Sequence, residues 1–90
     1  MNMEFMFRFV RKFKSHMVAM DVFEYLLNHD GEYRGSYHNL AEILRGSKGQ
    51  ASNIRNAVVW LMKQGFVHAE LISKAKGVYI TVGEHWKENV

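Results

Sequence analysis

The sequence contains no cysteine and no proline, and each absence excludes a class of structure. Without cysteine there is no disulfide scaffold, no cysteine-ligated zinc or iron–sulfur site and no thiol nucleophile. Without proline there is no proline-rich linker or recognition segment. Long hydrophobic runs are missing too, because the longest is the six-residue Ala57–Met62 and a membrane-spanning helix needs about 20 apolar residues. Because Arg8 and Arg11 interrupt the apolar residues near the N-terminus, we do not expect a signal peptide there.

Acidic residues are missing from one part of the chain. The formal net charge is +3, from 12 Lys and Arg against 9 Asp and Glu, but the charge is unevenly distributed. Residues 45–67 hold four basic side chains and no acidic one, whereas residues 17–44 carry a net negative charge. A segregated basic block is typical of proteins that bind a polyanion such as nucleic acid. A basic surface that only maintains solubility is the alternative that charge alone leaves open.

The 90 residues, 48% of them apolar, can form one small hydrophobic core, so we expect a single domain over residues 1–90. Over the first two-thirds of the chain, apolar side chains recur at spacings of three and four, which predicts helices. We expect these helices at residues 3–14, 16–29, 36–45 and 48–64. Ser15 and Ser36 are the expected N-caps of the second and third helices. Ser47 with Gln50 has the spacing of a capping box for the fourth.

The last third of the chain has a different pattern. After Gly65 the apolar period changes from 3.6 to 2, which predicts a β-hairpin over residues 66–82. The turn of this hairpin carries Lys74 and Lys76. The expected fold is therefore of the α+β class, mainly α with a C-terminal β-hairpin.

Two short segments complete the prediction. Glu32–Gly35 has the composition of a turn or a short strand. Thr81 with Glu84 has the spacing of a further capping box, which predicts a short last helix at residues 82–88. We expect Trp86 to turn back from that helix onto the core.

Three short motifs occur in a particular order. In chain order they are Leu40-Ala41 with Leu44, then Ile54, Val58 and Leu61, and then Gly65-Phe66-Val67. Over about residues 18–82 this order and spacing resemble the winged helix-turn-helix family of DNA-binding domains. The resemblance implies a helix-turn-helix at residues 36–45 and 48–64 and a wing at 66–82. The extra N-terminal amphipathic helix at 3–14 lies outside it and is predicted from apolar spacing, although the alternation Phe5-Phe7-Phe9 also permits a strand there. The connection between the two motif helices is longer than the common one.

The resemblance implies that the helix at residues 48–64 enters the major groove of duplex DNA. Its expected outward side chains are Lys48, Gln50, Ser52, Asn53, Arg55 and Asn56. Arginine can bind guanine, and asparagine or glutamine can bind adenine, through two hydrogen bonds each. We therefore expect Asn53, Arg55 and Asn56 to read the sequence. A solvated helix face is the competing explanation, although such a face normally includes Glu or Asp.

Three lysines are expected to contact phosphates and set affinity. Lys48 precedes the reading residues, while Lys74 and Lys76 lie at the wing tip, where an ordinary charged turn is the alternative. The resulting hypothesis is a small transcriptional regulator that binds double-stranded DNA sequence-specifically in the cytoplasm, associated with the nucleoid. A replication, plasmid or phage accessory factor is one alternative. A winged-helix module that binds protein and no DNA is another.

Val59 and Trp60 interrupt the polar face that the resemblance implies. An exposed tryptophan needs a covering surface. The nearest apolar surface that could cover it is a stripe on the first helix, made of Met6, Phe9, Val10 and Phe13. This stripe either folds over Trp60 within the chain or pairs with another chain. We predict a homodimer through the stripe, joined by Trp86, with an internal lid as the alternative.

Catalytic and metal-binding patterns are missing. None of the five histidines has metal-ligand spacing to a second one. Asp21 with Glu24 reads as a helix surface pair, and Gly46-Ser47-Lys48-Gly49 lacks the strand and spacing of a phosphate-binding loop. We therefore expect no enzyme activity, metal, cofactor or small-molecule substrate. The basic amphipathic helix 3–14 also has the character of a membrane-surface helix, but covering Trp60 is an internal use for the same residues, so we expect no membrane association.

Overall fold

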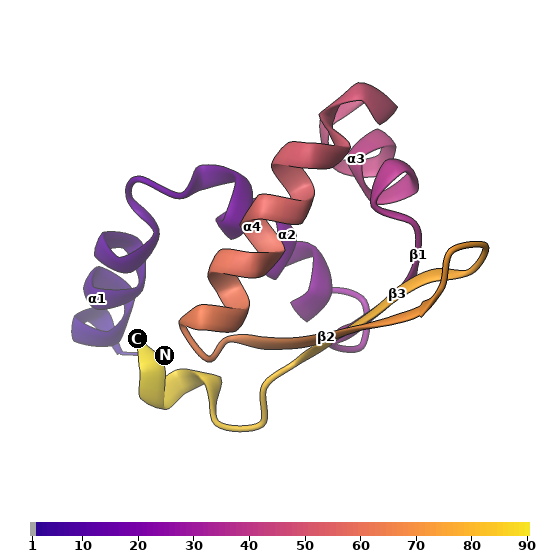
Figure 1. The fold of residues 1–90 in the computed structure, drawn as a ribbon. Helices are drawn as coiled ribbons and strands as arrows, with labels where there is room; N and C mark the ends of the chain where they lie inside the picture. The colour runs from indigo at the N-terminus through magenta and orange to yellow at the C-terminus, as the bar shows by residue number, and fades with distance from the viewer. Residues whose placement is uncertain (1) are drawn as a thin grey trace.

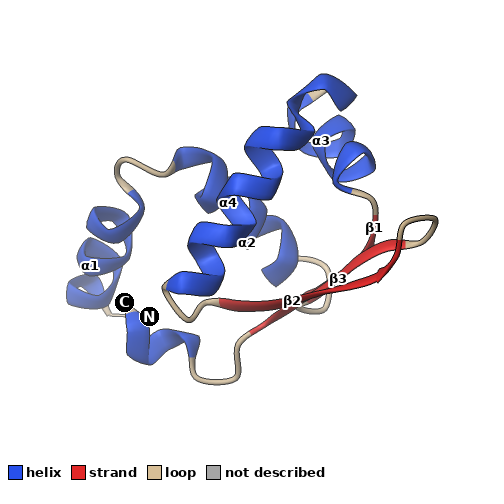
Figure 2. Cartoon of the chain, viewed as in Figure 1, coloured by secondary structure: helices blue, strands red, loops and turns tan. Residues whose placement is uncertain are grey.

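The structure, a computed structural model, describes residues 2–90 and packs helices against one face of a small antiparallel sheet (Figures 1 and 2). In chain order the elements are α1 (Met3–Phe13), α2 (Met17–Leu27), β1 (Glu32–Gly35), α3 (Tyr37–Arg45), the 3₁₀ turn η1 (Lys48–Gln50), α4 (Ala51–Lys63), β2 (Val67–Ser73), β3 (Gly77–Val82) and the 3₁₀ turn η2 (Trp86–Asn89). The predicted α+β class, with helices followed by a C-terminal hairpin, is confirmed.

The sheet has the strand order β1-β3-β2, and both pairings are antiparallel. Glu32–Gly35, for which turn and strand were both open, is therefore an edge strand that pairs with the second strand of the hairpin. Gly77 begins β3 beside the end of β1. A Cβ atom at Gly77 would overlap the carbonyl group of Gly35, and the φ of +87° is one that other residues rarely adopt.

The helix caps agree with the predictions at some positions and differ at others. Ser36 caps α3 as expected, because its Oγ accepts a hydrogen bond from the backbone N–H of Asn39 at 3.0 Å. The expected cap at Ser15 is wrong, since α2 begins after His16, which makes no side-chain capping bond. The Thr81–Glu84 box is also wrong. Thr81 stays in β3, and the last helix shrinks to η2.

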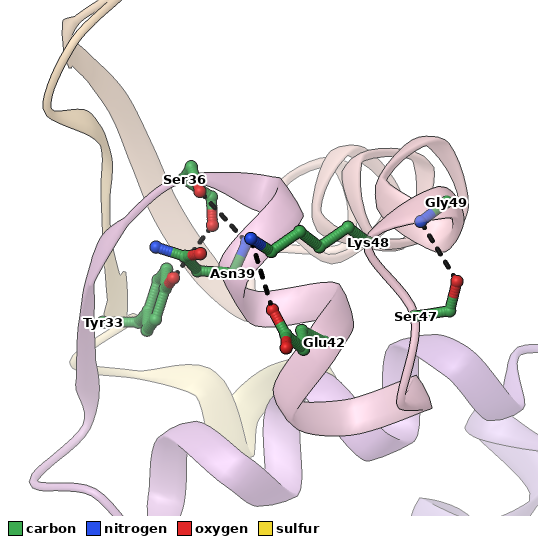
Figure 3. A network of polar contacts seen from close by, with 7 residues as sticks. All are labelled: Tyr33, Ser36, Asn39, Glu42, Ser47, Lys48 and Gly49. Atoms are coloured by element: carbon green, nitrogen blue, oxygen red, sulfur yellow. Dashed lines mark hydrogen bonds and ion pairs between the residues drawn. The ribbon is translucent and has the colours of Figure 1, made fainter.

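The predicted helix at residues 48–64 starts differently from expectation. Its first three residues form η1, and α4 proper begins at Ala51. Ser47 caps η1 by accepting from the backbone N–H of Gly49 at 3.2 Å (Figure 3). The side chain of Gln50 turns to Asn53 instead of back to Ser47, so the reciprocal capping box is not formed. A 3₁₀ turn therefore fills the long connection between the two motif helices.

The core is centred on an aromatic cluster that joins both ends of the chain. Phe13, Phe23 and Phe66 are fully buried, with ring centroids 5.2 to 6.0 Å apart. Trp86 turns back onto this cluster as predicted, 4.9 Å from Phe23. Phe13 was expected in a dimer interface, but its exposed fraction is 0%, so it belongs to the core of one chain and that assignment is wrong.

The molecule is elongated, with extents of 42 × 24 × 21 Å. Figure 1 shows α1, in indigo, at one end and the β2–β3 turn, in orange, at the other. The C-terminal turn η2, in yellow, lies beside α1. Contacts of α2 and α3 with α4 fill the space between, and α4 in turn contacts β2.

Candidate nucleic-acid interface

One face of α4 is exposed, as the periodicity predicts. Its opposite face is buried through Ile54, Ala57, Val58 and Leu61. The exposed polar side chains are Ser52, Asn53, Arg55, Asn56 and Lys63. At 3.6 residues per turn, Ser52, Asn56 and Lys63 follow the middle of this face, whereas Asn53 and Arg55 lie on opposite flanks. Because α4 contains no Asp or Glu, nothing on this helix repels a phosphate.

The N-terminal end of this face contains two internal contacts that the sequence did not indicate. Lys48 Nζ lies 3.6 Å from Glu42 Oε2, and Figure 3 shows its side chain extended from η1 towards α3. Gln50 is half-buried and accepts a hydrogen bond from the amide of Asn53 at 2.5 Å. Exposed ion pairs contribute at most about 1 kcal/mol, so a phosphate can replace Glu42 as the partner of Lys48.

Arg55 lies on the flank that faces the start of α3. Burial raises the pKa of the Tyr37 hydroxyl, and the positive charge of Arg55 partly opposes this by lowering that pKa. Arg55 is thus within electrostatic range of the first residue of α3.

Asn53, on the flank opposite Arg55, and Asn56, at the middle of the face, both border the α1–α2 junction. There a hollow of about 240 Å³ lies between α4 and Ser15–Ala19. Trp60 lines this hollow, with the His16 ring stacked on it at 4.0 Å and Phe13 edge-on at 5.4 Å. Trp60 is therefore covered from within the chain, which is the internal-lid alternative.

The hairpin turn presents the two wing lysines to solvent. Lys74 and Lys76 are both exposed, and Ser73 Oγ accepts a hydrogen bond from the backbone N–H of Lys76 at 2.9 Å. Leu71 and Ile72, beside the turn, have exposed fractions of 69% and 41%. The alternating sequence pattern did not reveal these two because it cannot show that the hairpin extends beyond the core.

The outer face of the sheet holds a polar cluster that the sequence analysis missed. The Tyr79 hydroxyl donates to Glu32 Oε2 at 2.7 Å, and the guanidinium of Arg34 lies 4.0 Å from the ring centroid. The hydrogen bond to Glu32 is the main reason that the pKa of Tyr79 is raised. Only the strand register brings Glu32 and Tyr79 together, since they are 47 positions apart in sequence.

Comparison with protein-family models, with curated proteins and with solved structures found no match. Within residues 2–90, no helix has the length and apolarity that crossing a membrane requires. In the same residues no three His, Asp or Glu side chains gather in a way that would hold a metal ion. Function is therefore inferred from the geometry of α4, the β2–β3 turn and α1.

Proposed function

We propose that this chain is a winged helix-turn-helix domain that binds double-stranded DNA sequence-specifically and acts as a small transcriptional regulator. The observation that carries the proposal is the exposed, carboxylate-free face of α4. Asn56 lies at its middle, and Asn53 and Arg55 lie on its flanks. These are side chains that can hydrogen-bond to base edges in a major groove. A surface that only maintains solubility normally mixes acidic with basic residues.

The arrangement around α4 supports the same proposal. α3 and α4 follow one another as two helices joined by a connection that contains η1, and α3 packs on both η1 and α4. The hairpin projects from the helices with Lys74 and Lys76 at its turn (Figure 2). Such a projection gives phosphate contacts outside the groove that α4 would occupy.

The test is duplex binding measured by fluorescence anisotropy between about 50 and 200 mM salt. If lysines and arginines neutralise about four phosphates, the log–log slope of affinity against salt is near −4. Asn56→Glu places a carboxylate at the middle of the α4 face and should abolish binding. Asn28→Glu adds the same charge at the exposed end of α2 and should leave binding close to wild type. A flat salt response, or equal effects of the two variants, would remove duplex DNA as the partner.

A protein-binding module is the second candidate. The observation that favours it is the exposed apolar side chains along α4 and the wing. They are Val59, Met62, Leu71 and Ile72, with exposed fractions of 39% to 69%. If no duplex binds at low salt, these residues become the candidate contact surface.

We extend the DNA-binding proposal to a homodimer. One recognition helix contacts only a few base pairs, which is too little to select a site in a genome. Helix-turn-helix proteins commonly solve this with a two-fold dimer whose recognition helices are one DNA turn apart.

A further inference from the structure

Uncovered apolar side chains gather on α1 and α2. Among residues 2–90, eleven large hydrophobic side chains are exposed, and six of them are on these two helices. The six are Met3, Met6, Phe7, Val10, Met17 and Leu27. A concentration of this kind marks an interaction surface, because single chains rarely leave large contiguous apolar patches in water.

A groove runs between α1 and α2 at this surface. It has a volume of about 330 Å³ and is lined by Met6, Phe9, Val10, Met20, Glu24, Leu27 and Trp86. Every lining residue except Glu24 is apolar or aromatic. Trp86 is held in place by its contacts with Phe9 and Phe23, at centroid distances of 6.1 and 4.9 Å. The groove is therefore a packed, hydrophobic surface with one carboxylate at its rim.

α1 carries more apolar surface than its own chain covers. Phe9 and Phe13 face inward and pack on Phe23. Phe7, on the outward side, is 58% exposed, and Val10, between Phe7 and the groove, is 53% exposed. The helix thus has one apolar edge in the core and a second edge without a partner in its own chain.

We infer that α1 of a second copy of this chain enters the groove, and that the same contact repeated by two-fold symmetry forms the dimer. The surface is self-complementary, because α1 supplies both a wall of the groove and the apolar edge that fits it. An amphipathic helix laid in an apolar groove is a common mode of recognition. The inference deepens the proposed function and rests on it for the role of the dimer, although the contact itself needs no DNA.

Charge complementarity also favours a second copy. Within residues 2–90 Glu24 makes no ion pair, whereas its neighbour Asp21 pairs with Arg45 at 2.9 Å. Arg11 lies one helical turn after Phe7 and flanks the outward apolar edge of α1. When the outward apolar edge of α1 enters the groove of the second copy, Arg11 comes towards the partner's Glu24. The same pairing occurs twice in a two-fold dimer.

The proposed interface leaves the DNA-binding elements free. α1 and the hairpin turn lie at opposite ends of the molecule (Figure 1). Lys74 and Lys76 are therefore far from the second copy. The two α4 helices are held in a fixed relationship, as a two-fold DNA site requires.

Sedimentation equilibrium of the 10.5 kDa chain at tens of micromolar, without DNA, tests the contact. We expect a dimer for the wild type and a folded monomer for the double variant Phe7→Glu with Val10→Glu. Both side chains are more than half exposed, so the monomer core should survive, which circular dichroism checks. Leu71→Glu, at an exposed wing residue, is the matched control and should remain dimeric.

A charge exchange tests the docking geometry independently of the apolar variants. Arg11→Glu and Glu24→Arg should each raise the dimer dissociation constant about tenfold, and their combination should restore it. A monomeric wild type, a dimer that survives Phe7→Glu with Val10→Glu, or a charge exchange without rescue would each overturn the inference. If the dimer forms as described but no duplex binds, the interface stands and the proposed DNA function fails. If the wild-type protein binds duplex as a monomer, the proposed DNA function stands and the proposed interface fails.

Discussion

The ring of Phe13 packs edge-on against Trp60, with centroids 5.4 Å apart. This contact joins the end of α1 to the C-terminal part of α4 and closes the apolar surface beside the proposed reading face. Phe13, the last residue of the amphipathic helix α1, thereby helps to anchor that helix to the rest of the domain.

Phe13→Ala should lower the free energy of unfolding by about 3–5 kcal/mol, because the side chain is fully buried among aromatic rings. Urea denaturation followed by circular dichroism measures the loss. Leu71→Ala, at a residue 69% exposed, should change the free energy by less than about 0.5 kcal/mol. Equal effects would mean that α1 does not contribute to the core.

Gly77→Ala should destabilise the sheet by about 2 kcal/mol or more, since the new methyl group meets the backbone of Gly35. Gly46→Ala is the matched control. Gly46 also has a positive φ, of +71°, but nothing lies within 4 Å of a Cβ atom there. Replacing Gly46 should lower the free energy of unfolding by only about 1–2 kcal/mol, because a residue with a Cβ atom is strained in this left-handed backbone conformation. Thermal unfolding should therefore show a clearly lower midpoint for the Gly77 variant.

Stability should fall at high pH, partly through Tyr33. Burial raises the pKa of Tyr33, and its hydroxyl donates to the carbonyl oxygen of Ser36 at 2.8 Å. Because the folded-state pKa is the higher one, this stabilisation is complete below about pH 10 and is lost as the pH rises through the folded-state pKa.

The measurement is the free energy of unfolding at about pH 9 and about pH 11. Tyr33→Phe should be less stable at the lower pH by about 1 kcal/mol, because the hydrogen bond is lost. It should also lose less stability than the wild type between the two pH values. If Tyr33→Phe had the same pH dependence as the wild type, Tyr33 would be excluded as a cause of the loss of stability at high pH.

Substitutions on α4 and at the hairpin turn should affect sequence preference and overall DNA affinity separately. Asn56→Ala should cost roughly 1–3 kcal/mol on the preferred site and relax the preference at one base pair, because a base contact is lost. Lys76→Ala should weaken binding to all duplexes alike and reduce the salt slope by about 1. Selection of sites from a random duplex library distinguishes the two. If the wing variant changes the preferred sequence and Asn56→Ala does not, the wing is the reader.

The order and type of the main elements follow from local sequence. Apolar spacing sets the four helices, and Gly65 marks the change to a period of 2 before the hairpin. The exposure of Asn53, Arg55 and Asn56 follows as well, because burying Ile54 and Val58 turns those side chains outward.

Other features depend on tertiary structure because they join residues far apart in the chain. The sequence pattern leaves Glu32–Gly35 open between turn and strand, and pairing with β3 decides it. Phe13 has the same helical spacing as Met6 and Val10, so periodicity cannot distinguish the core residue from the surface ones. The packing of Phe23, Phe66 and Trp86 around α1 makes that distinction, because only the folded chain shows which edge of an amphipathic helix its own core has room to bury.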